Sequence, residues 1–234
     1  MALNAREILG LLLIVVGIGF DKQWWVIPRE WAPWQPLHVS DPLTPITRWK
    51  LSRLKRSRDD CLAALETAPE GTLGYTPLDD YTPVADCPLT NVVRVRRGET
   101  TFNRSFVASC PLALTWTLYE QHRLQPLARE LFGQSIAQVQ HYGSFACRNV
   151  YGREKGRRSE HAGAEALDVA AFRLSDGRRI EVLKDWGGEG KAGTFLKRAQ
   201  EDACGLFGTA LGPEYNAAHA NHFHLGMRGM SFCR

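Results

Sequence analysis

The sequence lacks the features that define several classes of protein. It has no uninterrupted apolar run near the roughly 20 residues that a membrane-spanning helix needs, and 44% hydrophobic residues is too few for a multi-span membrane protein. It has no internal repeats, and its apolar content excludes a disordered chain. Charge of one sign is not in large excess, since 29 Lys and Arg face 25 Asp and Glu, a net charge of +4. We therefore expect neither nucleic acid nor a dinucleotide as a partner.

The longest apolar run lies at the N-terminus, from Ile8 to Phe20. About 13 residues is the size of a signal-peptide apolar region. No small-x-small cleavage site follows it; Trp24 and Trp25, of a type favoured at membrane interfaces, follow instead. We therefore expect residues 1–22 to be a signal peptide or, preferably, an uncleaved anchor that holds a periplasmic protein at the inner membrane. The alternative is a buried apolar helix of a soluble fold.

The six cysteines are well spread, and none forms a Cys-x-x-Cys pair of the kind that binds metal. In an oxidising compartment an even number of such cysteines predicts three disulfides. Six cysteines allow 15 pairings. Pairing neighbours along the sequence gives Cys61–Cys87, Cys110–Cys147 and Cys204–Cys233.

A proline-rich and tryptophan-rich segment separates the apolar run from the rest of the chain. Five of the 12 prolines lie between Pro28 and Pro45, interleaved with Trp31 and Trp34. This composition predicts that residues 23–45 form an extended linker that holds the domain off the membrane. The basic segment that follows, residues 46–58, has helical spacing of apolar residues. We favour a solvated helix face there over a patch for anionic lipid or wall polymer.

The remaining residues, 46–234, alternate helical and strand patterns within one folded domain. Helices are predicted over 59–65, 111–132 and 194–207. Strands are predicted over 91–97, 101–107, 136–143, 166–174, 179–183 and 222–227. Turn signals at Gly98 and at Asp176-Gly177 join two pairs of these strands as hairpins. The mixed order predicts an α+β fold with a mostly antiparallel sheet and flanking helices.

Two segments concentrate side chains that bind metal. They hold His161, Asp168, His219, His222 and His224. His222 and His224 are two apart on a predicted strand, so they share a face. His161 and Asp168 can meet only if the chain folds back between them, which Gly163 permits. Two imidazoles, one carboxylate and an open position are typical of a hydrolytic zinc centre; non-haem iron uses the same set, but export disfavours it.

These residues carry a resemblance to known families. Ser159-x-His161, Asp168 and the closing His-x-His are similar to the motif of the zinc D-Ala-D-Ala peptidases, and residues 219–224 resemble the ending of the penicillin-insensitive murein endopeptidases. From about residue 61 to residue 234, Cys147-Arg-Asn, Ser159-Glu-His, Ala166-Leu-Asp and His222-Phe-His resemble the bacterial extensin-like C-terminal domain family. One departure is Ala164, because the peptidase pattern has glycine three residues after the first histidine.

The resemblance implies a fold like that of the D-Ala-D-Ala metallopeptidases, with a metallopeptidase-like core over residues 110–234. It implies that His161, Asp168 and His224 hold Zn²⁺, and that His222 and His219 assist catalysis. The implied activity is cleavage of peptidoglycan peptides in the cell envelope. The alternative is an inactive wall-binding module that keeps the metal-site residues.

Three further residues are candidates for binding substrate. Arg148 and Arg153 precede the first metal-site histidine, and a guanidinium there could hold a substrate carboxylate. Ser159 could hydrogen-bond within the metal loop. Each also fits an ordinary solvated or turn position.

Overall fold

The computed structural model describes residues 4–22, 25–229 and 232–234. Trp24, one of the two residues expected at a membrane interface, lies outside them. Among the described residues, nine strands form one sheet in the order β1-β4-β5-β6-β7-β10-β9-β11, with β8 paired to β7. The parallel pairs are β5 with β6 and β9 with β11, and the others are antiparallel. The predicted α+β class with a mostly antiparallel sheet is confirmed.

Six strands of this sheet follow the alternating patterns of the sequence. They are β4 (Val92–Arg97), β5 (Thr101–Ser109), β6 (Ile136–Gly143), β7 (Ala166–Leu174), β8 (Arg179–Glu181) and β10 (Phe223–Gly226). The predicted strand over 179–183 ends early, because a short helix, α6 (Val182–Asp185), begins there. The two predicted hairpins, β4–β5 and β7–β8, are confirmed.

Five short strands had no prediction. They are β1 (Gly74–Pro77), β2 (Tyr81–Val84), β3 (Cys87–Leu89), β9 (Thr209–Leu211) and β11 (Phe232–Cys233). Each has two to four residues, too few to show a two-residue period. Their pairing partners, rather than their own sequence, hold them in strand conformation.

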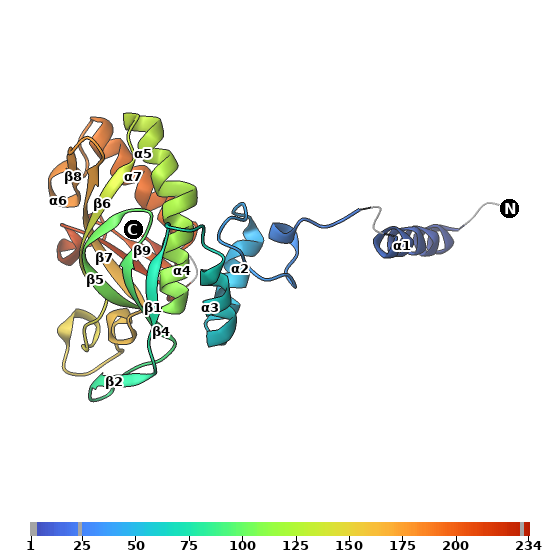
Figure 1. Ribbon diagram of the computed structural model, residues 1–234, viewed down its shortest axis with the longest axis horizontal. Coiled ribbons are helices and arrows are strands. Elements are labelled where there is room, and N and C mark those ends of the chain that lie inside the picture. Colours follow the sequence, from blue (N-terminus) through green and yellow to red (C-terminus); the bar gives the residue numbers. More distant parts are fainter. Residues whose placement is uncertain (1–3, 23–24, 230–231) are drawn as a thin grey trace.

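Helices cover one face of the sheet (Figure 1). The predicted helix over 111–132 consists of α4 (Cys110–Tyr119), a π-helical turn at Glu120–Leu124 and α5 (Gln125–Phe132), and Gly133 ends it at a φ of 66°. The predicted helix over 194–207 is α7 (Lys191–Cys204). Trp116, Phe172, Phe195 and Phe207 fill the space between these helices and the sheet, each less than 2% exposed.

The N-terminal apolar run forms α1 (Ala5–Asp21). Among the residues that the structure describes, no helix is both long enough and apolar enough to cross a membrane. The basic segment forms α2 (Pro45–Leu54), followed by α3 (Arg58–Glu66) at the predicted short helix. Both helices pack beside α4 (Figure 1).

The segment expected to be an extended linker packs against the domain over much of its length. It contains a short 3-10 helix, η1 (Arg29–Trp31), and its Leu37 and Val39 are buried in the main core. The backbone N–H of Val39 donates to Thr67 Oγ1 at 2.9 Å, and its carbonyl oxygen lies 2.6 Å from His122 Nε2. The prolines leave no α-helix here, as expected, but the apolar residues between them are buried near Thr67 at the end of α3 and His122 in the π-helical turn.

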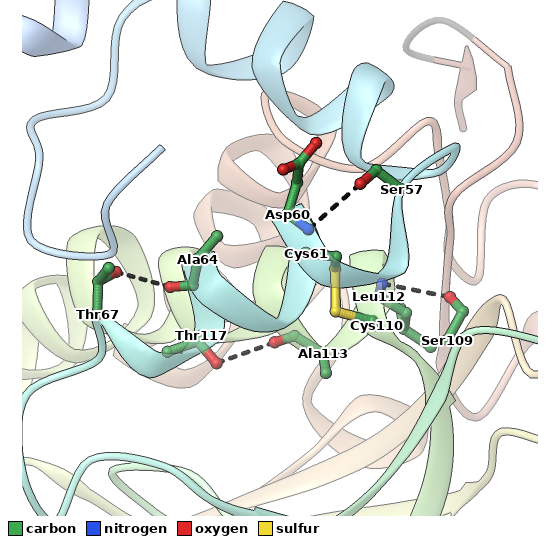
Figure 2. Close-up of a disulfide and its surroundings, with 10 residues drawn as sticks. All are labelled: Ser57, Asp60, Cys61, Ala64, Thr67, Ser109, Cys110, Leu112, Ala113 and Thr117. Carbon is green, nitrogen blue, oxygen red and sulfur yellow. Dashed lines mark hydrogen bonds between the residues drawn. A yellow bond between two sulfur atoms is a disulfide. The ribbon is translucent and has the colours of Figure 1, made fainter. Parts of the chain in front are cut away.

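Three disulfides cross-link the domain. The predicted Cys204–Cys233 bond is confirmed, but the other two predicted pairs are wrong. Cys61 on α3 bonds to Cys110 at the start of α4 (Figure 2), and Cys87 on β3 bonds to Cys147 in the loop after β6. The sequence-neighbour rule failed because α3 packs against α4, which brings Cys61 to Cys110 and leaves Cys87 to pair with Cys147.

The Cys61–Cys110 bond lies where two capped helices meet (Figure 2). Ser57 accepts a hydrogen bond from the backbone N–H of Asp60 at the start of α3. Ser109 likewise accepts one from Leu112 at the start of α4. Such caps satisfy N–H groups that a helix start leaves unpaired. The disulfide thereby holds the N-terminal helices on the helix that supports the sheet.

Candidate metal centre

The candidate metal centre begins with a cross-strand pair. Strands β7 and β10 are antiparallel neighbours, and their register places His224 opposite Asp168. Alternation along β7 sends Leu167 and Val169 into the core, where neither is exposed, and turns Asp168 to the other face. His224 Nδ1 lies 3.0 Å from Asp168 Oδ1. The sheet itself therefore fixes one imidazole against one carboxylate.

His161 reaches the same point from a 3-10 turn, Glu160–Gly163, which precedes β7. Ser159 caps this turn by accepting a hydrogen bond from the His161 backbone N–H. His161 Nε2 lies 3.2 Å from Asp168 Oδ2 and 3.1 Å from His224 Nδ1. One potential ligand atom of each residue lies within 4.8 Å of the others. The predicted meeting of His161, Asp168 and His224 is therefore present in the fold.

The chain folds back through Ala164 rather than through Gly163. Ala164 is fully buried and has a φ of 51° and a ψ of 35°, the left-handed conformation that glycine adopts most easily. This is the position at which the peptidase pattern has glycine. Although the residue differs, the backbone keeps the left-handed conformation that glycine would favour. Alanine, the smallest residue with a Cβ, occupies that position.

On His161 and His224, the ring nitrogen that does not face Asp168, here called the outer nitrogen, lies near a hydrogen-bond acceptor. These contacts bear on whether the cluster suits a cation. His161 Nδ1 lies 3.1 Å from the Ser144 carbonyl oxygen, and His224 Nε2 lies 3.4 Å from Glu160 Oε2. A histidine that donates its outer N–H to such a group presents a lone pair on its inner nitrogen. Two lone pairs and the Asp168 carboxylate would then converge, and a bound cation would satisfy all three.

The charges in the cluster stabilise one another. Burial acts to raise the pKa of Asp168, but hydrogen bonds from His161 and His224 outweigh it and hold that pKa well below its usual range. Burial acts to lower the pKa of His224, but hydrogen bonds to Asp168 and Glu160 raise it to about 9. In the absence of a cation, a proton on His224 therefore holds the cluster together.

Glu160 is a functional candidate that the sequence predictions missed. Its Oε1 accepts a 2.6 Å hydrogen bond from the Arg228 backbone N–H, while its Oε2 faces His224. A Cβ at Gly226 would come within 2.5 Å of the Glu160 carboxylate, so this glycine leaves room for it. Its position directly before His161 was the available signal. Only the fold shows that the neighbouring side chains of Glu160 and His161 both reach the centre, Glu160 through His224 and His161 through Asp168.

His222 and His219 border the cluster. His222 Nε2 lies 3.6 Å from Asp168 Oδ1, and its Nδ1 is held 2.8 Å from Asn221 Oδ1. His219 Nδ1 lies 2.8 Å from Asn216 Oδ1. Burial, followed by the nearby histidines, lowers the pKa of His219 to about 4, and burial also lowers the pKa of His222. Both imidazoles are therefore neutral near pH 7 and able to accept a proton.

The cluster opens into a cleft of about 580 Å³. Of the three predicted substrate-binding residues, Arg148 and Ser159 line this cleft. Arg153 is not among the lining residues, and its guanidinium lies over the Tyr151 ring at 5.7 Å. Arg157, Arg228, Tyr151 and Tyr215 also line the cleft and were not predicted.

Two tyrosines join the sides of the cleft mouth. Tyr151 Oη lies 3.1 Å from Tyr215 Oη and accepts a hydrogen bond of 3.1 Å from Asn216 Nδ2. Tyr151 also has a positive φ of 59°, which is uncommon for a large side chain. Nothing in the local sequence pairs these residues, since they are 64 positions apart.

The fold and the cluster define an α+β protein with two histidines and one aspartate gathered at a cleft beside its sheet. A family model described as extensin-like protein C-terminus matches residues 59–234. The chain belongs to this family, as its motifs predicted. No curated protein and no solved structure matches the chain in the corresponding comparisons.

Proposed function

We propose that this protein is a zinc-dependent peptidase that cleaves peptidoglycan peptides in the bacterial cell envelope. The observation that carries the proposal is the convergence of His161, Asp168 and His224 at a cleft, with neutral histidines beside them. Two imidazoles and one carboxylate with an open position form the ligand set of hydrolytic zinc sites. The motif resemblance to zinc D-Ala-D-Ala peptidases supplies the substrate class.

Zinc in such a site acts as a Lewis acid and lowers the pKa of water to about 7. The remaining chemistry belongs to side chains of this protein. His222, fixed by Asn221 and near Asp168, would take up and return a proton at Nε2. His219, which borders the same cluster, would help to hold His222 in position. Arg148, at the cleft wall, would hold a carboxylate of the peptide stem.

The proposed location is the periplasm, with α1 as the attachment to the inner membrane. Three disulfides suit an oxidising compartment. The exposed apolar side chains between Ile8 and Ile18 all lie on α1, and lipid would cover them. Peptidoglycan lies in the same compartment, so enzyme and substrate would meet there.

The first test is metal content of the full chain by plasma mass spectrometry. We expect one zinc per chain, lost in His161→Ala and kept in His222→Ala. Release of peptides from purified sacculi should be absent in both variants. Loss of zinc from His222→Ala would show that His222 is a ligand, and iron in place of zinc would favour an oxygenase.

The second candidate function is a wall-binding module without turnover. Ala164 favours it, because a strained, buried alanine stands where the peptidases have glycine. Such a module would bind zinc and sacculi normally but release no fragment. Sacculus binding and digestion, measured on the same zinc-loaded sample, separate the two functions.

A further inference from the structure

Exposed large apolar side chains gather at the N-terminal end of the chain. Nine residues of α1 between Ile8 and Ile18 are at least 43% exposed. Trp31, Trp34 and Trp49 are 53%, 68% and 42% exposed. In the C-terminal part Trp116 is buried and Trp186 is half-buried. Exposed indoles concentrated in one region indicate a surface that contacts something other than water.

Two of these tryptophans line one groove. Trp34, Trp49 and Arg53 border a hollow of about 600 Å³ between the segment around residue 35 and helices α2 and α3. The Arg53 guanidinium lies 4.8 Å from the centre of the Trp49 ring. The groove therefore offers indole surface and positive charge together, the combination that proteins present to the headgroup layer of a membrane.

The groove lies in a basic region. Residues 46–58 contain six Lys and Arg and no Asp or Glu. Three of the six are bound within the fold, since Lys50, Lys55 and Arg58 donate to backbone carbonyl oxygens. Arg53 and Arg56 are exposed on or just after α2. Asp60 also lines the groove, but over residues 46–60 six Lys and Arg face two Asp. The excess of positive charge favours an anionic surface as the occupant.

Chain connectivity keeps this region close to α1. Helix α1 ends at Asp21 and η1 begins at Arg29, so the connection spans at most about 28 Å. Figure 1 shows η1 and α2 between α1 and the sheet, whereas the loop that carries residues 150–160 lies on the far side of the domain. A membrane that holds α1 would meet the tryptophan groove before it met the cleft.

We propose that the groove formed by Trp34, Trp49 and Arg53 is a docking surface for the headgroup layer of an anionic phospholipid bilayer. The exposed Trp31 and Arg56, three positions along the chain from Trp34 and Arg53, would add further contacts. This surface is distinct from the attachment through α1, and it rests on the envelope location proposed above. Indoles would occupy the interfacial layer while the arginines neutralise lipid phosphates. Docking would orient the domain with its cleft away from the membrane.

The test uses the full chain in vesicles of phosphatidylcholine with 30% phosphatidylglycerol, in which some acyl chains carry bromine as a quencher of tryptophan fluorescence. We expect Trp34→Phe to lose part of the quenched signal. Trp186→Phe, a matched change beside Phe223 in the body of the domain, should leave the quenched signal unchanged. Equal quenching in wild type and Trp34→Phe would overturn the proposal. Thermal unfolding of Trp34→Phe should match wild type, because that side chain is 68% exposed.

Variants that remove positive charge test whether anionic lipid is the partner. Arg53→Gln and Arg56→Gln should each reduce the docked population in anionic vesicles about fivefold, because a basic residue near such a surface contributes about 1 kcal/mol. Neither should change it in pure phosphatidylcholine. Co-sedimentation separates this inference from the anchor, which by itself would quench Trp24 and Trp25. A chain that pellets with vesicles but loses no quenched signal in Trp34→Phe keeps the anchor and refutes docking. Binding of glycan strands that Trp34→Phe abolishes would assign the groove to a sugar instead.

Discussion

The two ends of the cleft differ in how their side chains are held. At the metal end, His161 and His224 are at most 8% exposed and come from a capped turn and a paired strand. At the other end, Arg148 and residues 151–158 lie exposed in a loop that closes at a bridge between Asn149 and Arg158, and its contacts to the rest of the domain are exposed ones such as that of Tyr151 with Tyr215. The groups proposed for chemistry are positioned before substrate arrives, whereas the groups proposed for recognition are free to adjust to it.

This difference predicts that changes at the metal end act on metal binding, whereas changes in the loop act on substrate. The largest expected effect is that of pH on zinc affinity. The pKa of His224 is raised to about 9, so the metal must displace a proton below that pH. Affinity should rise about tenfold per pH unit from pH 6.5 to 9 and level off above it.

Stability of the metal-free protein should move in the opposite direction. A raised pKa contributes stability that is complete below the ordinary histidine pKa near 6.5 and is lost as pH rises through 9. Competition with a chelator measures the affinity, and urea unfolding measures the stability. Arg148→Gln should show the same affinity slope. A flat affinity profile would contradict a proton on His224.

The next effect tests the loop. Replacing Cys87 and Cys147 together by serine removes the cross-link at the base of this loop, between residues 60 positions apart. We expect urea unfolding to show a loss of about 2 to 4 kcal/mol. Zinc content should stay at one per chain, because the strands that carry Asp168 and His224 are unaffected. Loss of zinc would mean that the loop and the metal end are not independent.

A smaller effect tests the support behind the ligands. Glu160→Ala should weaken zinc binding about 10- to 100-fold, the usual cost of losing an outer hydrogen-bond partner. The zinc affinity of Glu160→Gln should lie between those of wild type and Glu160→Ala, because one amide oxygen can accept from either His224 or the Arg228 N–H but not both. Glu154→Ala, an exposed carboxylate in the loop, is the control. Unchanged affinity in Glu160→Ala would remove Glu160 from the centre.

The smallest effect concerns Ala164. In Ala164→Gly, relief of about 1 kcal/mol of left-handed strain offsets the loss of about 0.8 kcal/mol from one buried methyl group. The free energy of unfolding, measured by thermal denaturation, should therefore change by less than about 1 kcal/mol. Ala164→Val, which introduces a β-branched side chain, should lower it by at least about 2 kcal/mol. Sacculus digestion that appears only in Ala164→Gly, at equal zinc content, would favour the binding module for the natural chain.

The sequence allowed the metal end to be predicted better than the loop. Asp168 and His224 could be found because they stand on strands with clear alternation, and the histidines are clustered in the chain. Tyr151, Tyr215 and Arg228 could not, because the cleft gathers them from separate segments through tertiary contacts. The same reason explains the two wrong disulfides. The bonded cysteines lie on elements that tertiary packing brings together, α3 with α4 and β3 with the loop after β6, and no local pattern records that packing.

The disulfide connectivity has a consequence for how the chain matures. Cys61–Cys110 and Cys87–Cys147 interleave along the sequence, since each bond encloses one cysteine of the other. In a chain that emerges from a membrane N-terminus first, Cys61 and Cys87 are the first two thiols to meet an oxidant. A bond between them would be non-native, and thiol–disulfide exchange would have to undo it before α3 is locked onto α4. Yield of the oxidised protein should therefore depend on a disulfide isomerase, in addition to an oxidant.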